Sequence, residues 1–236
     1  MTWFVLKNSR RAIQNELHLV LRNVVPENEP SAVVDAGAWL GDHAIPMAEG
    51  FPELTVYAIE PSARNAVYIR ERGIALPNLR VMSFLLGREQ GQGSVIANED
   101  RPNARYALKG VPRAGSIPVH TVDGLVDSGT IKESIRLLHF DVEGSELDDL
   151  RGSLRTIQSQ KPVVLVETLG DELSAIEDFF QNEVKAAYAR LTVDESCKAF
   201  DLWDASYCRN HFFVPQALLA QMKEGVKPNE RPGASG

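Results

Sequence analysis

Three residues that can exchange protons lie two positions apart in the chain: His139, Asp141 and Glu143. The apolar run at residues 135–141 predicts a strand, and side chains two positions apart on a strand share one face. We therefore expect all three to converge near the carboxyl end of this strand. An alcohol becomes a good nucleophile once a base takes its proton, and histidine or a carboxylate is the usual base. The spacing predicts that Asp141 positions a hydroxyl group or accepts its proton, with His139 and Glu143 as further catalytic candidates.

Two of these residues also have a structural interpretation. A histidine in an apolar strand, such as His139, is as often a buried residue with a satisfied hydrogen bond as it is a base. Glu143 would share the catalytic role, reach the amino group of a cofactor, or cap the helix predicted to begin near Ser145. Buried carboxylates are rare without a partner or a task, which favours a functional role for Asp141. For His43, in the helix after the first glycine turn, a surface position is favoured over one that faces the cofactor.

A glycine turn predicts a nucleotide pocket. The β-branched run at residues 32–36 leads into a turn with Gly37 and Gly41, and strand-turn-helix units of this kind bind nucleotides at the strand tips. A ligand can approach the backbone closely at Gly37, because glycine has no side chain. In the dinucleotide-binding fingerprint the middle glycine makes room for a pyrophosphate. This chain has Trp39 there, next to Ala38, so the turn suits a nucleoside ligand without phosphates better.

An acidic residue follows at the expected place for ribose binding. Glu60 lies nineteen residues after Gly41, at the end of the strand predicted over residues 54–59, where a carboxylate accepts hydrogen bonds from both ribose hydroxyls. The alternative is a solvated strand end. Asp35 would bind the amino-acid part of the ligand, directly or through water, or hold the glycine turn by accepting from its amides. Adenine needs an apolar pocket with one or two polar contacts, which by position would come from Pro61, Ser62, Ser83 and Phe84. The full set of predicted cofactor-binding residues is Asp35, Gly37, Ala38, Gly41, Glu60, Pro61, Ser62, Ser83 and Phe84.

A nucleoside-bearing ligand without phosphates points to S-adenosyl-L-methionine, whose positive charges suit an acidic pocket. The chain resembles the FkbM family of S-adenosylmethionine-dependent methyltransferases, most specifically in Asp141-Val142-Glu143-Gly144. The matching runs are residues 34–43, 57–61, 121–125, 138–147, 163–167 and 211–215. His139 stands where the family usually has lysine, and Trp39 where it commonly has asparagine. The resemblance implies methyl transfer to a hydroxyl oxygen, often on a sugar or a natural product.

The elements that must position these residues alternate between strand and helix. Alternation of this kind is typical of βαβ units with parallel strands. Strands are expected at residues 32–36, 54–59, 79–86, 135–141 and 163–167, helices at 61–72, 145–159 and 172–182, and a closing hairpin or antiparallel edge at 187–193 and 210–214. The resemblance makes the expected fold class α/β: a Rossmann-like class I methyltransferase fold, with a mostly parallel seven-stranded sheet, an antiparallel edge hairpin and helices on both faces.

The 236 residues predict one α/β domain. We assign residues 1–30 to an N-terminal amphipathic helix and linker, 31–215 to the methyltransferase domain, and 216–236 to a C-terminal helix and disordered tail. Within the domain, residues 87–120 are expected to leave the sheet as loops and minor strands that carry substrate contacts.

Composition narrows the choice of partners. The net charge of -7 argues against nucleic acid and favours a small-molecule hydroxyl acceptor. Cys197 and Cys208 form no Cys-x-x-Cys pair, which predicts neither a disulfide scaffold nor a structural metal. Asp141 and Glu167 alone are weak evidence for magnesium, so no metal is predicted. No run of about 18 apolar residues occurs, and we expect a soluble, cytoplasmic protein.

Two other functions fit part of the pattern. A nicotinamide-dependent oxidoreductase would also have the ribose-binding acid, but this chain lacks the middle glycine of the dinucleotide-binding fingerprint. A non-catalytic nucleoside-binding module would have the pocket and no catalytic activity. The sequence leaves the identity of the acceptor and the oligomeric state open.

Overall fold

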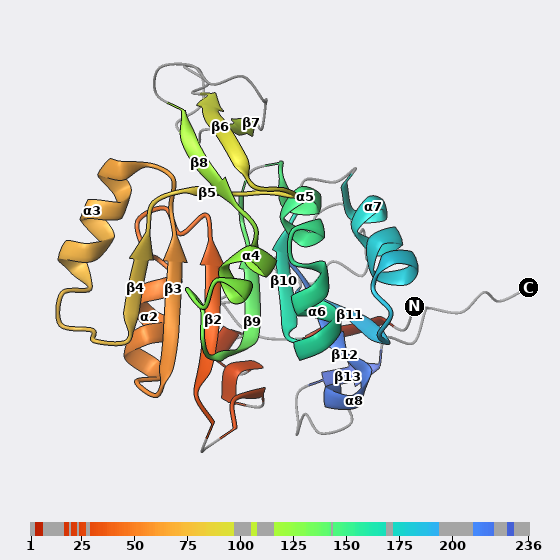
Figure 1. Ribbon diagram of the computed structural model, residues 1–236. Coiled ribbons are helices and arrows are strands. Elements are labelled where there is room, and N and C mark those ends of the chain that lie inside the picture. The colour runs from red at the N-terminus through yellow and green to blue at the C-terminus, as the bar shows by residue number, and fades with distance from the viewer. Residues whose placement is uncertain are drawn as a thin grey trace, which may run out of the picture.

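The computed structural model describes residues 3–6, 17–18, 20–22, 24–26, 29–96, 105–107, 116–142, 144–168, 172–193, 210–219 and 226–228. Their strands form two sheets. The larger sheet has nine strands, in the order β13 (Val226–Pro228), β1 (Trp3–Leu6), β11 (Tyr188–Val193), β12 (Asn210–Pro215), β10 (Val163–Glu167), β9 (Ser134–Phe140), β2 (Ser31–Ala36), β3 (Leu54–Ile59) and β4 (Leu79–Met82). The smaller sheet has the order β5 (Leu85–Leu86), β8 (Ile117–His120), β6 (Gly91–Ile96) and β7 (Arg105–Ala107). Figure 1 shows the smaller sheet above the carboxyl ends of the central strands.

Seven strands, from β4 to β11, make the mostly parallel sheet that was predicted. β2 pairs in parallel with β3 on one side and with β9 on the other. The pairs β3–β4 and β9–β10 are parallel as well. β12 is antiparallel to both β10 and β11. β1 adds a parallel strand to β11, and β13 pairs antiparallel with β1. The predicted seven-stranded α/β fold is confirmed, but the β11–β12 pair lies inside a larger sheet rather than at its edge.

Helices cover both faces of the sheet, as Figure 1 shows: α2 (Ala44–Gly50) lies behind the strands, and α4 (Val122–Asp127), α5 (Glu146–Arg151) and α6 (Leu154–Gln160) lie in front. Successive residues of β2 pack into different layers. Val33 belongs to the core cluster that contains Ile45 of α2, whereas Val34 belongs to the cluster that contains Leu125 and Ile157. Both faces of the central strands are buried, which explains their continuous apolar sequences.

Helix starts differ from the predicted ones for reasons of capping. α2 begins at Ala44, so Pro46 is its third residue, where the missing N–H would have had no partner within the helix. The helix predicted from residue 61 is α3 (Ala63–Arg72). Its N-cap is Ser62, whose hydroxyl accepts from the N–H of Asn65 at 3.3 Å.

Three predicted elements are interrupted. The strand expected over residues 79–86 ends at Met82, and β5 pairs with β8 of the smaller sheet instead. The helix expected over residues 145–159 is divided into α5 and α6, with Gly152 between them. A Cβ at Gly152 would lie 2.0 Å from the carbonyl oxygen of Gly87, so the chain is pressed against the smaller sheet there. The third helix is α7 (Leu173–Asp178), which continues into the π-helical turn η2 (Phe179–Glu183).

The two ends of the chain both contribute strands that the sequence pattern did not predict, namely β1 and β13. Helical residues Leu17, Val20 and Leu21 are buried in the core on the α2 side, at the spacing expected of an amphipathic helix. α8 (Gln216–Leu219) follows β12. Cys197, Cys208 and most of the predicted tail lie outside the described residues, and the domain boundaries stay predictions.

The turn after β2 packs directly onto the end of β9. Gly37 has a φ of +81°, and a Cβ there would lie 1.8 Å from the carbonyl oxygen of Asp141. The N–H of Asp141 donates to the carbonyl oxygen of Ala36 at 3.0 Å. The N–H groups of Gly37 and Ala38 both donate to the carbonyl oxygen of Ile59, at 3.0 and 3.1 Å. Only glycine combines this left-handed backbone with so close an approach.

Replacing Gly37 tests this contact. We expect Gly37→Ala to lower the free energy of unfolding by about 3 kcal/mol or more, because backbone strain adds to a collision with the backbone of β9. Gly129→Ala is the control, since Gly129 has a φ of +69° but open space around its Cβ, and it should cost only about 1 kcal/mol. Urea unfolding followed by circular dichroism measures both. Equal losses in the two variants would contradict the close packing at Gly37.

Candidate functional site

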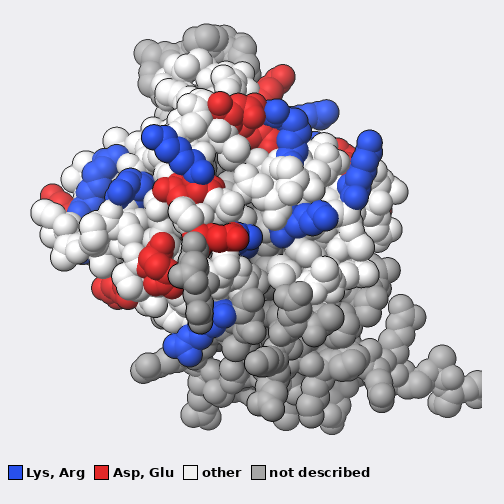
Figure 2. Space-filling view, turned by 60° about the horizontal axis from the view of Figure 1, so that its bottom comes forward, with Lys and Arg blue, Asp and Glu red and all other residues white. Residues whose placement is uncertain are grey.

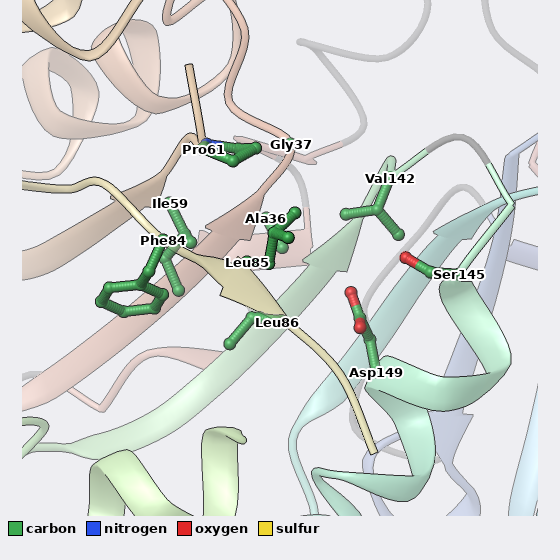
Figure 3. Close-up of a pocket in the computed structure, with 10 residues that line it drawn as sticks. All are labelled: Ala36, Gly37, Ile59, Pro61, Phe84, Leu85, Leu86, Val142, Ser145 and Asp149. Carbon is green, nitrogen blue, oxygen red and sulfur yellow. The ribbon is translucent and has the colours of Figure 1, made fainter. Parts of the chain in front are cut away.

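A pocket lies at the carboxyl edge of the sheet, where the ends of β2 and β3 meet the segment that leads into α5 (Figure 3). It has about 260 Å³ of space, part of it open to solvent. Most of its wall is apolar, and its polar side chains are Ser145 and Asp149. The lining residues are Ala36, Gly37, Ile59, Pro61, Phe84, Leu85, Leu86, Val142, Ser145 and Asp149.

Glu60, between the pocket residues Ile59 and Pro61, holds the glycine turn. The side chain is buried, and its Oε2 accepts from the N–H of Trp39 at 2.9 Å while its Oε1 accepts from the N–H of Ser62 at 2.8 Å. Trp39 has a φ of +46°, so this hydrogen bond stabilises a left-handed residue. Burial raises the pKa of Glu60, although the two N–H groups oppose the shift. A carboxylate has about four acceptor positions, so Glu60 keeps capacity for further donors.

Asp35 and His139 form a buried pair beneath this turn. They face each other in the register of β2 and β9, with Asp35 Oδ1 and His139 Nδ1 2.6 Å apart and both side chains at most 2% exposed. Burial alone would lower the pKa of His139. The hydrogen bond and charge of Asp35, with the charges of Asp141 and Glu167, outweigh burial and raise that pKa. The imidazolium form of His139 is therefore favoured.

His43 packs against this pair. Its ring lies edge-on to His139, with the ring centroids 5.0 Å apart. Burial lowers the pKa of His43, and the nearby His139 lowers it further, which favours the neutral form of His43. The favoured surface position of His43 is not what the structure shows, because the residue is half-buried and packs against the buried His139.

The three catalytic candidates lie in different surroundings. His139 is buried and bonded to Asp35, which fits the structural interpretation of this residue. Asp141 is half-buried and directly precedes the pocket residue Val142. Glu143 lies outside the described residues. The catalytic roles of all three stay predictions.

Asp149 is the pocket residue that sequence reasoning missed. It is 1% exposed, and burial raises the pKa of its carboxyl well above the ordinary value, with the charges of Glu146 and Asp148 adding to the shift. Burial likewise raises the pKa of Glu146 to about 7, although both of its oxygens accept from the N–H of Gly144. The signal was spacing: Glu146, Asp149 and Leu150 are the buried positions of α5, three and four residues apart on one helical face.

The structure brings only part of the predicted cofactor set to this pocket. Gly37, Pro61 and Phe84 line it. The remaining members lie around it, either within the turn, beneath it, or at the entry to α3 and β5: Asp35, Ala38, Gly41, Glu60, Ser62 and Ser83. Their binding roles stay predictions, since Ser62 serves as a helix cap and Asp35 as the partner of His139. Among the described residues, no three His, Cys, Asp or Glu side chains are grouped to hold a metal ion.

The fold has the form of a class I methyltransferase. The sequence profile of the methyltransferase FkbM domain matches residues 35–188, so the chain belongs to the FkbM methyltransferase family. No curated protein sequence matches the chain. Within the described part of the chain, no helix is both long and apolar enough to cross a membrane.

Solved structures resemble the chain at low sequence identity. Methyltransferase FkbM from Methylobacillus flagellatus KT has a TM-score of 0.55 at 16% identity, over 83% of this chain and 48% of that one. The chain thus spans about half of that protein's length. An rRNA methylase from Streptococcus thermophilus has a TM-score of 0.49 at 13% identity, over 88% of this chain and 96% of that one. A precorrin-6y C5,15-methyltransferase from Geobacter metallireducens GS-15 has a TM-score of 0.42 at 12% identity, over 88% of this chain and 92% of that one. Of these likenesses only that to methyltransferase FkbM, with its TM-score above 0.5, bears on the fold, and none bears on function.

Breaking the buried pair should destabilise the protein. Asp35→Asn leaves His139 without its charged partner, and we expect a loss of about 3 kcal/mol in the free energy of unfolding. A histidine whose folded pKa is raised stabilises fully below its unfolded pKa of about 6.5 and loses that effect as the pH rises through the folded value. The difference between the variant and the wild type should therefore be largest below pH 6.5 and shrink at higher pH. Unfolding by urea at several pH values measures it.

The control for this prediction is Asp127→Asn, which breaks an exposed ion pair with Arg155. It should change stability far less, because exposed pairs are screened by water. A similar loss in both variants, or a difference that does not depend on pH, would contradict the charged state of the Asp35–His139 pair.

Proposed function

We propose that the protein is an S-adenosylmethionine-dependent O-methyltransferase that moves a methyl group to a hydroxyl of a small molecule, a saccharide or a secondary metabolite. The observation that carries the proposal is the glycine turn of a methyltransferase family member, held by Glu60 next to an apolar pocket. Methyl transfer follows from the family. The donor, the hydroxyl acceptor and the residue roles belong to this proposal.

The residues around the pocket fit the proposed donor. Gly37 lines the pocket, so a ligand bound there can contact the backbone of the turn. Glu60 has acceptor capacity left for ribose hydroxyls. Pro61, Phe84 and Leu86 supply an apolar wall for adenine. Asp149 Oδ1 and Oδ2 have no hydrogen-bond partner among the described residues, and a buried polar group of this kind calls for a ligand.

In this proposal the chain's own residues act mainly by positioning. When bound, the cofactor supplies an electrophilic methyl group on a sulfonium. Asp141, whose N–H donates to the carbonyl oxygen of Ala36 at the end of β9, would hold the acceptor hydroxyl and accept its proton at a carboxylate oxygen. His139 and Asp35 act beneath it as positioning residues. Holding two reactants at bonding distance contributes effective molarities of about 10⁵ M or more.

Charge supports a small-molecule acceptor over nucleic acid. On the face shown in Figure 2, basic and acidic side chains of the described residues are interspersed and form no broad positive surface. The whole chain has a net charge of -7. Binding to a phosphate backbone depends on clustered lysine and arginine side chains. Family membership leaves the nicotinamide oxidoreductase alternative without support.

Ligand binding tests the donor. S-adenosylhomocysteine titrated into the protein in a calorimeter should bind, and NAD should not. Glu60→Ala should weaken S-adenosylhomocysteine binding by about 1–3 kcal/mol, because charge-assisted hydrogen bonds are lost. Glu133→Ala is the control: Glu133 also accepts hydrogen bonds from β3 side chains, but near the opposite end of the strand. Unchanged affinity in Glu60→Ala would argue against a ribose site at Glu60, and tight NAD binding would argue for an oxidoreductase.

Methyl transfer tests the catalytic assignment. With methyl-labelled S-adenosylmethionine and a panel of saccharides, glycolipids and phenolic metabolites, the wild type should label at least one hydroxyl. Asp141→Asn should bind S-adenosylhomocysteine as the wild type does and lose about 10²-fold or more in turnover. Unchanged turnover in Asp141→Asn would refute the role of Asp141. Label on nitrogen or carbon instead of oxygen would refute O-methylation.

A further inference from the structure

Asp149 is a buried acid on the wall of an otherwise apolar pocket. Figure 3 shows its carboxyl group pointing from α5 into the pocket, toward Val142 and Ser145. It is 1% exposed, and neither oxygen has a hydrogen-bond partner among the described residues. A buried polar group without a partner is destabilising. Retaining an acid here is therefore expected to serve something that enters the pocket.

The protonation state of Asp149 decides what it can bind. Burial raises its pKa well above the ordinary value, and the charges of Glu146 and Asp148 on the same helix raise it further. This shift favours the neutral carboxylic acid over the carboxylate. Such an acid has one O–H donor beside one C=O acceptor, which is the hydrogen-bonding pattern of an asparagine side chain.

A donor next to an acceptor on a short planar group matches one edge of adenine. Adenine presents its exocyclic amine as a donor beside a ring nitrogen as an acceptor, and asparagine binds this pair with two hydrogen bonds in protein–DNA complexes. The neighbouring wall suits a flat ring, since Pro61, Phe84 and Leu86 are apolar. Ser145, the other polar lining residue, lies one helical turn before Asp149.

We propose that Asp149 is the specificity-determining residue for the adenine base of the methyl donor. Its carbonyl oxygen accepts from the exocyclic amine, and its hydroxyl donates to the adjacent ring nitrogen. The inference rests on the proposed function, because it names the residue that recognises one part of the proposed cofactor. It also assigns a task to the otherwise unexplained buried acid of α5.

The test compares two ligands and four proteins by calorimetry. The ligands are S-adenosylhomocysteine and its purine analogue that lacks the exocyclic amine. The wild type should bind the analogue about tenfold more weakly or worse, because the buried carbonyl oxygen then lacks its donor. Asp149→Leu should lose about tenfold or more for S-adenosylhomocysteine and bind the two ligands alike. Asp149→Asn keeps one donor and one acceptor and should behave as the wild type does. Glu71→Leu, at an exposed position of α3, is the control and should keep the wild-type preference.

The outcomes separate this inference from the proposed function. A wild type that fails to bind S-adenosylhomocysteine refutes the cofactor itself. A wild type that binds both ligands equally refutes the role of Asp149 without reference to any variant. If Asp149→Leu folds, by circular dichroism, and still prefers S-adenosylhomocysteine, the recognition lies elsewhere. If it does not fold, Asp149→Asn decides: affinity within about threefold of the wild type supports the inference, and a loss of tenfold or more overturns it.

Discussion

The geometry of this protein depends on the close contact between the turn after β2 and the end of β9. Gly37 lies against the backbone of Asp141, and the same turn is hydrogen-bonded to Ile59 at the end of β3. Three strand ends are thus joined at one point by backbone groups. Any side chain at Gly37 would separate them. This contact fixes the positions of Asp141 and Glu60, because Asp141 directly follows β9 and Glu60 directly follows β3. It also fixes the part of the pocket wall that Ala36 and Ile59 form at the ends of β2 and β3.

Charge is distributed around this contact in two layers. Below the turn, Asp35 and His139 form a buried hydrogen-bonded pair that links β2 to β9, with His43 packed against it. Beside the pocket, burial raises the pKa values of Glu60, Glu146 and Asp149, although at Glu60 two N–H donors oppose the shift. The pairing of His139 with Asp35 and the raised pKa of Asp149 are different responses to the same desolvation cost. Only the second leaves hydrogen-bonding groups available to a ligand.

Sequence patterns predicted the central parallel strands well, because strands of βαβ units are buried on both faces and therefore have continuous apolar sequences between turns. They also placed Gly37 and Glu60 at the carboxyl edge. The patterns failed where tertiary contact decides: β4 ends at Met82 because β5 pairs with another sheet, and β1 and β13 exist only through pairing with distant strands. Asp149 was missed because a single acid on a predicted helix reads as a solvated surface residue. The burial of that helical face depends on the packing of α5 against the pocket.

The most direct measurement is a crystal structure of the protein grown with S-adenosylhomocysteine. The account predicts the nucleoside in the pocket between Gly37, Pro61 and Leu86, with its ribose hydroxyls at Glu60. A ligand bound on another part of the surface, or a ribose that faces away from Glu60, would contradict it.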